Sequence, residues 1–420
     1  MLLIYKISTF LVLPLVILIL FIRVIFKKET FESLSQKILP KKNYKLIYQN
    51  CIWFHAASIG EALTIFPIIE EIKRKQNKDP ILITTNTISS AKIVKEKIKE
   101  YNNLVHRFFP LDNSIIVKKF LNIWKPKLII FVDSEIWPNS LSIIKDKGIK
   151  LILLNARITN KTFTRWKIFR STARNIFSKF DLCLPCSIES EQNLREIGVE
   201  KMKYIGNLKF SQNYFPKVNN RVSESILESS KIWCAASIHE GETEIILKTH
   251  LKLKKKLDNI ISVIIPRHII NSKKIFKEAE DLGLSAQILN SGQNMLINKE
   301  IIIINSFGSL SEFFYYCKNV FIGKSLIKKF KNDGGQNPIE AAKNGCKIFY
   351  GPNVSNFTEI YNYLDGLQIS KKIKDENELA ENLKENFNFP VQKNSKNIEI
   401  LTQNGKHILD KTLIEIQKFL

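Results

Sequence analysis

A carboxylate in the first turn of a predicted helix is well placed for chemistry. Residues 52–72, IWFHAASIGEALTIFPIIEEI, predict a short apolar strand, a run of small residues and an amphipathic helix. Gly60 allows close backbone approach, Ser58 can cap the helix, and Glu61 follows in its first turn. In an open α/β sheet such a strand-to-helix turn lies at the edge where ligands bind. Glu61 is therefore a candidate functional carboxylate, and simple complementation of the helix dipole is the alternative.

Two further carboxylates end another predicted strand. The apolar run at residues 128–132 continues directly into Asp133 and Glu135, and the strand expected at residues 151–155 ends beside Arg157. Because parallel strands end at the same edge of a sheet, we expect these side chains to gather in one polar cleft with Glu61. Capping of the following helix by the two acids is the alternative interpretation.

Basic residues end two more predicted strands. Lys209 closes the strand expected over residues 204–210, just after a Gly-Asn turn, and Pro266 and Arg267 close an apolar run. An arginine at a strand edge suits a phosphate. Lys209 could contact a phosphate or carboxylate, or could simply be an exposed charge.

Residues 333–340, DGGQNPIE, form the most informative stretch of the carboxyl-terminal half. Two glycines free the backbone, and Pro338 suits a first helical turn. Asn337 and Glu340 are then expected on one helix face. Unpaired N–H groups at such a turn can hold a phosphate, while Glu340 accepts hydrogen bonds from ribose hydroxyls. The stretch therefore predicts a nucleotide site, with a plain helix cap as the alternative.

The elements that must position these residues alternate as strand and helix along both halves of the chain. This alternation predicts doubly wound parallel sheets, and 420 residues suit two α/β domains. A polar linker over residues 211–230 separates the halves. Beyond it, Ala-Ala-Ser-Ile followed by Gly-Glu repeats the stretch around Glu61, as expected if each domain begins with a strand-to-helix turn.

The net charge of +24 favours anionic partners such as nucleic acid, anionic lipid or a phosphorylated substrate, although part of it can be compositional bias. The lysines are scattered, without the Arg-rich runs or stacking aromatics of RNA-binding proteins, so no nucleic-acid partner is expected. Among the six cysteines, only Cys183 and Cys186 have ligand spacing, and no second pair completes a zinc site. Buried thiols in a reducing compartment are expected instead.

The amino-terminal residues predict a membrane anchor. The sequence is apolar from Met1 to Phe26 apart from Lys6 and Arg23, which is long enough to span a bilayer as one helix. The basic residues that follow predict that the rest of the chain stays on the cytoplasmic side. A cleaved signal peptide is the alternative, but no small-x-small cleavage pattern follows the apolar run.

Six motifs in order resemble those of the 3-deoxy-D-manno-octulosonic acid (Kdo) transferases, which move Kdo from CMP-Kdo to the lipid A precursor. They are HAASIGE (55–61), DSEIWPN (133–139), NARIT (155–159), GNLKF (206–210), PRH (266–268) and GGQNPIE (334–340).

The resemblance implies a GT-B architecture of two Rossmann-like domains facing across a cleft. The expected boundaries are an anchor at residues 1–28, an acceptor domain at 29–212, a linker at 213–229 and a CMP-sugar domain at 230–420, whose last helix could pack back on the first domain. The resemblance also implies an inverting glycosyltransferase of lipopolysaccharide biosynthesis that releases CMP. The enzyme would lie at the inner membrane, with a single membrane span and its catalytic domains in the cytoplasm. No cofactor and no metal are expected.

The resemblance also assigns residues. Glu61 would be the general base for the acceptor hydroxyl, with Asp133 and Glu135 in support and Lys209 stabilising charge in the transition state. The CMP-Kdo contacts would be made by Pro266, Arg267, Phe307, Gly308, Ser309, Asn337, Pro338, Ile339 and Glu340.

Four departures from the family pattern affect this assignment. Asp133-Ser-Glu135 stands where Glu-x-Glu is usual, Ser309 replaces a usual Glu, Ile238 replaces a usual Thr, and Gly323-Lys324-Ser325 replaces Gly-Gly-Ser. The loop at residues 326–332 is also about four residues longer. Two other classes of function remain as alternatives: a sugar-nucleotide epimerase of similar shape, and a non-catalytic basic protein at a membrane.

Overall fold

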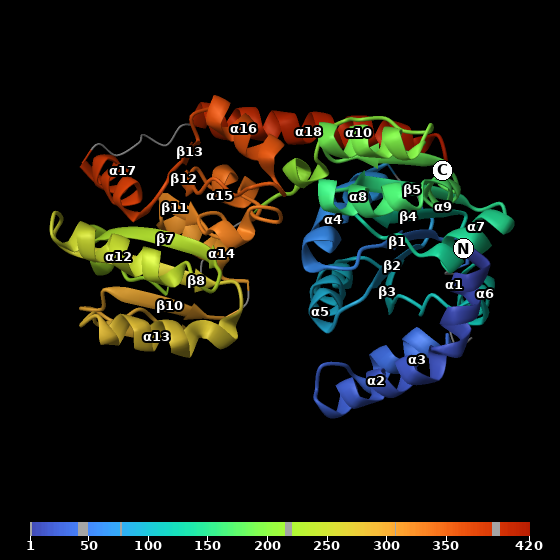
Figure 1. The fold of residues 1–420 in the computed structure, drawn as a ribbon, viewed down its shortest axis with the longest axis horizontal. Coiled ribbons are helices and arrows are strands. Elements are labelled where there is room, and N and C mark those ends of the chain that lie inside the picture. The colour runs from blue at the N-terminus through green and yellow to red at the C-terminus, as the bar shows by residue number, and fades with distance from the viewer. Residues whose placement is uncertain (1, 41–48, 76–77, 215–220, 307, 389–394) are drawn as a thin grey trace. The chain divides into compact units, whose positions relative to one another are not determined.

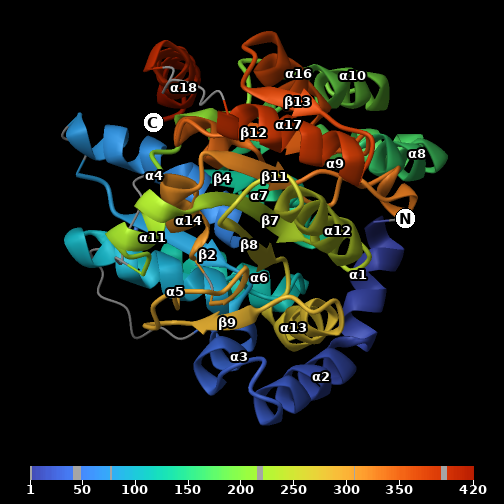
Figure 2. The ribbon, with the colours of Figure 1, turned by 90° about the vertical axis from the view of Figure 1, so that its left-hand side faces the viewer.

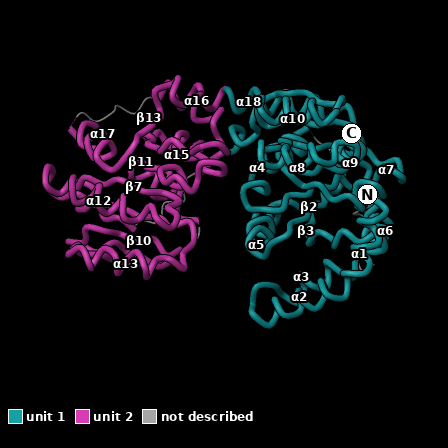
Figure 3. The backbone as a smooth tube through the Cα atoms, viewed as in Figure 1, with its two compact units in different colours: residues 1–212, 404–420 teal, residues 213–403 magenta. Residues whose placement is uncertain are grey.

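The computed structural model describes residues 2–40, 49–75, 78–214, 221–306, 308–388 and 395–420 (Figure 1). The chain forms two compact units, coloured separately in Figure 3. Unit 1 comprises Met1–Gln212 with Asn404–Leu420, and unit 2 comprises Asn213–Gln403.

Unit 1 is built on a six-stranded sheet of order β3-β2-β1-β4-β5-β6 in which every neighbouring pair is parallel. The strands are β1 (Ile52–His55), β2 (Ile81–Thr85), β3 (Leu104–Phe108), β4 (Leu128–Val132), β5 (Lys150–Ala156) and β6 (Leu182–Pro185). The apolar sequences of β1 and β4 are buried along their whole length, as central parallel strands require. The strand order reverses between these two strands, so loops that follow them flank the usual ligand crevice of such a sheet.

Helices cover both faces of this sheet and supply its hydrophobic core. They are α4 (Ile59–Arg74), α5 (Ile88–Lys97), α6 (Ser114–Trp124), α7 (Pro138–Asp146), α8 (Asn160–Ile168), α9 (Arg170–Phe177) and α10 (Ile188–Ile197). Trp53 of β1 lies at the centre of one core cluster, where its ring packs against Phe120 and Phe131. The alternation of strand and helix predicted from the sequence is confirmed.

Unit 2 repeats the plan with a seven-stranded parallel sheet of order β13-β12-β11-β7-β8-β10-β9. The strands are β7 (Lys231–Ile238), β8 (Ile260–Pro266), β9 (Ala286–Asn290), β10 (Ile301–Asn305), β11 (Asn319–Ile322), β12 (Lys347–Tyr350) and β13 (Ser370–Lys372). The order reverses between β7 and β11. The two sheets confirm the expected pair of Rossmann-like folds.

The helices of unit 2 enclose a core around Trp233. They are α11 (Glu224–Ser229), α12 (Thr243–Lys254), α13 (Ser272–Asp281), α14 (Leu310–Tyr316), α15 (Ile339–Lys343), α16 (Thr358–Gly366), α17 (Glu376–Asn388) and the first part of α18 (Ser395–Gln417). The repeated Ala-Ala-Ser-Ile sequence begins a strand-to-helix turn in both units, β1 to α4 and β7 to α12.

The amino-terminal apolar residues form two helices where one was predicted. α1 (Leu2–Leu11) and α2 (Leu13–Ile25) meet at a bend of 53°. Pro14 lies in the first turn of α2, and because proline has no backbone N–H it cannot donate a hydrogen bond to a carbonyl of α1. Within the described part of the chain, no single helix is long and apolar enough to cross a bilayer, and this bent pair satisfies both criteria only as a pair. α3 (Phe31–Ile38) follows α2.

The segment predicted as a strand at residues 204–210 differs in the structure. Gly206 has φ 128°, and Leu208–Ser211 form a short 3-10 helix, η3. Asn207 caps the start of this helix, because its Oδ1 accepts the N–H of Lys209 at 3.0 Å. The prediction of a strand here was therefore wrong. Nearby, Lys203 pairs with Glu415 at 2.6 Å, in the part of α18 that belongs to unit 1.

Candidate functional site

Glu61 and Ser58 hold each other at the start of α4. Glu61 Oε1 accepts the Ser58 hydroxyl at 2.6 Å and Oε2 accepts the N–H of Ala57 at 2.8 Å, while Ser58 Oγ accepts the N–H of Glu61 at 3.4 Å. This is a reciprocal cap, so the predicted complementation of the helix start is real. It fixes the carboxylate at the carboxyl end of β1, where the strand order reverses.

The electrostatic setting of Glu61 goes beyond that of a cap. Burial raises its pKa, and the nearby carboxylates of Asp133 and Glu135 raise it further, against the lowering effect of the hydrogen bonds from Ser58 and Ala57. A carboxylate with a raised pKa binds a proton more readily than an ordinary surface glutamate. Glu61 is therefore suited to take a proton from a bound hydroxyl group.

Asp133 turns the chain directly after β4. Its φ of 64° is left-handed, a conformation that Asp tolerates better than most residues. Its Oδ1 accepts the Ser134 hydroxyl at 2.9 Å, and its Oδ2 lies 3.8 Å from Lys209 Nζ. The Asp133–Lys209 pair is largely buried, with 12% and 15% of the side chains exposed, so η3 places a cation at the edge that carries Glu61.

Glu135 is held by one side chain from β1 and one from its own loop between β4 and α7. Its Oε2 accepts Trp137 Nε1 at 2.7 Å and lies 3.0 Å from His55 Nε2. Burial opposes ionisation of Glu135, but the hydrogen bond and charge of His55 and the hydrogen bond of Trp137 outweigh it, so the pKa of Glu135 is lowered. The two acids near the sheet centre thus differ: the pKa of Glu61 is raised and that of Glu135 is lowered.

Neither Asp133 nor Glu135 caps the next helix. The N-terminus of α7 has no side-chain cap at Trp137. Asp112, which follows β3, accepts the N–H of Asn139 at 3.1 Å and that of Ser140 at 2.7 Å. The capping alternative is therefore wrong, and both acids stay at the sheet edge.

His55 was not predicted as a functional residue, although it lies in the HAASIGE motif. His55 is the last residue of β1 and is buried between Phe109, on which its ring stacks, and the strand end of β4. Its Nδ1 contacts Thr84 Oγ1 at 3.0 Å, which orients Nε2 toward Glu135. A histidine at the end of an otherwise apolar central strand was the available signal.

In unit 2, basic side chains surround His239, which follows β7. Burial lowers the pKa of His239 to about 4, together with the neighbouring groups Lys324, His268, Arg267 and Lys329. Arg267 and His268 follow β8 and are exposed, and the His268 ring lies 6.1 Å from that of His239. Lys324 follows β11, so the ends of three adjacent strands bring Arg267, Lys324 and the nearby Lys329 around His239, and these three cations are called the cationic cluster.

Glu242 fixes the backbone beside this cluster. It is fully buried, and its carboxylate accepts the N–H groups of His239, Lys324, Ser325 and Leu326 at 2.7–3.2 Å. Lys324 has φ 59°, which this network holds in place. The preceding Gly323 has no room for a side chain, because a Cβ would lie 2.6 Å from Ser237 O. Glu242 belongs to the repeated Gly-Glu pair of the sequence, but no function was predicted for it.

The predicted nucleotide loop is close-packed and differs from the prediction in one respect. A Cβ on Gly334 would lie 2.2 Å from Asn353 O, so only glycine fits there. α15 begins at Ile339, so Asn337 precedes the helix, accepts the Ile339 N–H at 3.1 Å, and does not share a helix face with Glu340. Gln336 Nε2 lies 3.3 Å from His239 Nε2, which joins this loop to the centre of the cationic cluster.

The other predicted donor contacts vary in accessibility. Glu340 accepts the Ser311 hydroxyl, and burial raises its pKa while that hydrogen bond lowers it. Gly308 is exposed, whereas Ser309 is buried with its hydroxyl 2.7 Å from that of Ser306. The side chains of Pro266, Pro338 and Ile339 are buried, and Phe307 lies outside the described residues.

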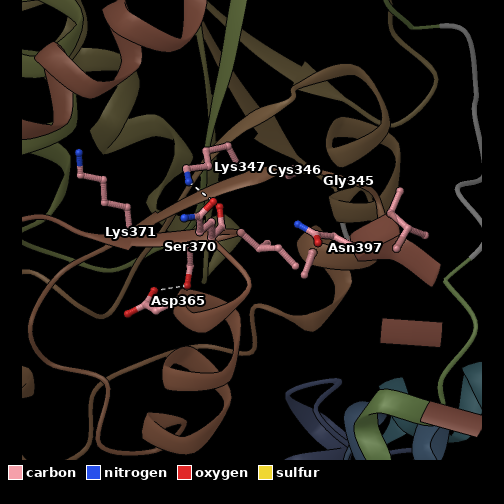
Figure 4. A pocket seen from close by; sticks show the side chains of 11 residues that line it. Gly345, Cys346, Lys347, Asp365, Ser370, Lys371 and Asn397 are labelled. Carbon is pink, nitrogen blue, oxygen red and sulfur yellow. Dashed lines mark hydrogen bonds between the residues drawn. The ribbon is translucent and has the colours of Figure 1, made fainter. Parts of the chain in front are cut away.

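A cavity of about 500 Å³ lies elsewhere in unit 2, at the amino-terminal ends of β12 and β13 (Figure 4). Its polar groups are engaged with one another: Lys347 Nζ donates to Gln368 O at 2.6 Å, and Asp365 accepts the Ser370 hydroxyl. A second cavity, of about 450 Å³, lies between α12 and α13 and includes His239 in its wall. The second cavity lies at the carboxyl ends of the strands, where ligands of such sheets bind.

Comparison with known proteins identifies the family. Residues 28–212 match the family model described as 3-deoxy-D-manno-octulosonic-acid transferase (kdotransferase). The 3-deoxy-D-manno-octulosonic acid transferase of Rickettsia bellii is 31% identical over 423 residues, covering 99% of both chains. The chain belongs to the Kdo transferase family. The Kdo transferase of Aquifex aeolicus is 30% identical over 84% of this chain and 90% of its own. Like other Kdo transferases, the chain is a glycosyltransferase, and the predicted family is confirmed.

Solved structures support the fold of this Kdo transferase. UDP-GlcNAc 2-epimerase from Neisseria meningitidis matches with a TM-score of 0.58 and 13% identity over 87% of this chain and 99% of its own. A glycosyltransferase from Rickettsia africae matches with a TM-score of 0.56 and 11% identity over 88% and 98%. At such low identity these neighbours show the GT-B-like fold alone.

Proposed function

We propose that this Kdo transferase moves Kdo from CMP-Kdo to a hydroxyl of the lipid A precursor with inversion, releasing CMP. The observation that carries this proposal is Glu61, a carboxylate of raised pKa beside Asp133 and Glu135 at the centre of the unit 1 sheet. Membership of the Kdo transferase family supports Kdo as the transferred sugar, and the setting of Glu61 supports its role as the general base.

In the proposed step, the acceptor hydroxyl oxygen forms a bond to the anomeric carbon of Kdo while the bond from that carbon to the CMP phosphate oxygen breaks. The electron pair of the broken bond leaves with CMP, and Glu61 takes the hydroxyl proton. Lys209, 3.8 Å from Asp133, supplies positive charge where negative charge develops. Glu135, kept ionised by His55 and Trp137, maintains the high proton affinity of Glu61.

We assign the donor to unit 2. CMP-Kdo carries a phosphodiester and a carboxylate, and the cationic cluster around His239 offers Arg267 and Lys324 to such anions. Glu340 already accepts a hydroxyl hydrogen bond from Ser311, which is the interaction that a ribose hydroxyl would make. Lys324 stands where the family usually has glycine, so its contact with the donor substrate CMP-Kdo would be particular to this chain.

We further propose that the acceptor is reached at the cytoplasmic face of the inner membrane. The exposed apolar residues of α1 and α2 and the net charge of +24 fit an anionic lipid surface and a phosphorylated glycolipid. A non-catalytic basic protein would not need a carboxylate of raised pKa such as Glu61. A sugar-nucleotide epimerase would not need a lipid acceptor or the membrane-binding surface.

The test is a mass spectrum of the lipid A precursor after incubation with CMP-Kdo and the purified full chain. Growth of the acceptor by one or more whole Kdo units is expected, with release of CMP only when acceptor is present. Glu61→Ala should abolish growth, whereas Glu70→Ala, an exposed carboxylate on the same helix, should leave it intact.

Two results would contradict the proposal. CMP release without acceptor growth would indicate hydrolysis or another acceptor. Unchanged growth with Glu61→Ala would assign the base to another residue. Binding of CMP, measured by calorimetry on the same variants, should be unaffected by Glu61→Ala because that residue lies in unit 1.

A further inference from the structure

The helices α1 and α2 leave the body of unit 1 and return to it, so both ends of the pair are tied to the same unit. α1 packs against α7 and α2 packs against α3. Figure 1 shows both pairs, and Figure 2 shows α2 and α3 side by side. We infer that this pair is an in-plane membrane element that enters one leaflet of an anionic bilayer, with its two ends on the same side.

Polar contacts hold α1 on unit 1. The Tyr5 hydroxyl donates to Asp112 Oδ2 at 3.0 Å, and Asn139 Nδ2 donates to Thr9 Oγ1 at 2.9 Å. Asp112 is the same residue that caps α7, and Leu2 packs against the unit 1 core. If α1 crossed a bilayer, all of these contacts would be lost, and no water would be present to accept the hydrogen bond of the Tyr5 hydroxyl.

The far end of α2 is held by a buried ion pair. Glu29, which follows α2, accepts Lys37 Nζ at 2.8 Å and the Ser33 hydroxyl at 2.6 Å, both from α3. α3 is in turn hydrogen-bonded to the sheet, because Gln36 Oε1 accepts the N–H of Phe108, the last residue of β3, at 2.9 Å. The chain therefore returns to unit 1 within a few residues of the end of α2.

The remaining length is too short for a span. α2 has 13 residues and would extend about 20 Å, against a hydrocarbon core of about 30 Å. With α1 docked on unit 1, α2 alone cannot cross. It can lie along the interface with its apolar side chains in the acyl region.

The surface of α2 suits lipid. Leu20 is the one buried residue of this fully described helix. Its large apolar side chains are 41–64% exposed at Leu15, Leu18, Ile19, Phe21, Ile22 and Ile25. Arg23, Lys27 and Lys28 border this surface, and all three are exposed. Such a basic border favours anionic headgroups over another apolar protein surface.

The lipid surface would meet the edge of the sheet that carries the candidate base. Lys37 Nζ donates to Asn86 O at 3.1 Å, Asn86 N–H to Ala57 O at 3.4 Å, and Ala57 N–H to Glu61 Oε2 at 2.8 Å. α3 thus lies at the carboxyl ends of the strands, where Glu61 stands. An acceptor whose acyl chains stay in the leaflet would present its sugar to this edge. This inference rests on the proposed membrane attachment but not on the transfer chemistry.

Labelling with a membrane-impermeant maleimide tests the topology. Lys6→Cys and Lys28→Cys each add one exposed thiol, and the six native cysteines are buried and serve as background in the wild type. Both variants should label in inverted membrane vesicles and neither in intact spheroplasts. Labelling of Lys6→Cys only from the outside of spheroplasts would establish a span and overturn the inference.

Vesicle flotation tests the lipid contact. With vesicles of phosphatidylethanolamine and phosphatidylglycerol, the double variant Leu18→Glu, Ile22→Glu should bind roughly tenfold or more weakly than wild type. The matched variant Leu296→Glu, Ile297→Glu changes two exposed apolar residues of unit 2 and should bind normally. Equal binding by both variants would overturn the inference.

Two further outcomes are informative. Failure of the wild type to float with any vesicle would contradict the membrane attachment itself. A stable dimer that the Leu18→Glu, Ile22→Glu variant loses would show that a second copy covers α2, and would also overturn the inference. Transfer to detergent-dispersed acceptor should persist in the α2 variant, so loss of lipid binding is separable from failure of the proposed chemistry.

Discussion

Glu61 and Glu242 occupy the same place in the two units but are used differently. Each follows a glycine in the turn after the first strand of its unit. Glu242 is fully buried and accepts four backbone N–H groups, whereas Glu61 is partly exposed and accepts one N–H and one hydroxyl. A carboxylate saturated by backbone donors is part of the scaffold. A carboxylate with few donors and two acidic neighbours retains its affinity for a proton.

The largest effect is expected for Glu61→Gln. Because the amide cannot take a proton, kcat should fall by about 10³-fold, within the range for loss of a general base. The free energy of unfolding should change by less than about 1 kcal/mol, since the amide oxygen can still accept one of the two hydrogen bonds. Glu70→Gln is the matched control, and a similar loss of activity there would remove the distinction between the two carboxylates of α4.

Glu242→Gln should instead reduce stability. One amide oxygen cannot satisfy four backbone donors, and the amide hydrogens would face them, so unit 2 should lose about 3 kcal/mol of unfolding free energy. Urea unfolding measures this. Glu244→Gln changes an exposed carboxylate on α12 that pairs with Lys248, and it should leave the free energy of unfolding nearly unchanged because surface ion pairs contribute little. Near-normal stability of Glu242→Gln would show that the carboxylate is not a scaffold residue.

A smaller effect is expected for Ser58→Ala, which leaves Glu61 with one hydrogen-bond donor fewer and so increases its difference from the four-donor Glu242. It removes the hydrogen bond that lowers the pKa of Glu61, so that pKa should rise. The ionised form is the active base, so the acid limb of the profile of kcat/KM against pH should move to higher pH. Loss of the helix cap alone should cost about 1 kcal/mol of stability. Ser187→Ala removes the cap of α10 and should leave the acid limb unchanged.

The smallest difference between the two units is expected in acid stability, which should fall alike in both. Burial lowers the pKa of His106 in unit 1 to about 3 and that of His250 in unit 2 to about 4. Unfolded histidines bind protons below about pH 6.5, but these folded ones do not, so stability is lost as pH falls from 7 to 5. The expected loss is about 1–2 kcal/mol for each residue. His106→Gln should flatten the profile of unit 1 alone, and an unchanged profile would contradict the assignment.

Much of the fold followed from local apolar patterns. Strands such as β1, β4 and β8 are runs of mostly apolar residues, as expected of central parallel strands, and polar residues at or after their ends marked the edge. β13, with the sequence SKK, has no such pattern, because an edge strand of three residues buries little. The strand predicted before Lys209 failed because Gly206 and Asn207 favour a turn.

The candidate site was harder to predict, since its contacts join residues distant in sequence. The sequence pointed to Glu61 and Glu135, but not to His55 and Trp137 as donors to Glu135. It suggested Asp133 or Glu135 as a helix cap, whereas Asp112 fills that role from another strand end. Side chains that converge at one sheet edge come from different strands, and a local pattern does not record which of them meet.

The final seventeen residues of the chain, Asn404–Leu420, complete unit 1 only after all of unit 2 has been synthesised. Leu413 and Ile416 are buried, and Glu415 pairs with Lys203. At about 5–20 residues per second, the ribosome needs roughly 10–40 s to translate the intervening unit. During that interval the nascent unit 1 exposes the apolar surface that this segment covers. A chain truncated before Asn404 should therefore be an early target for chaperones and proteases.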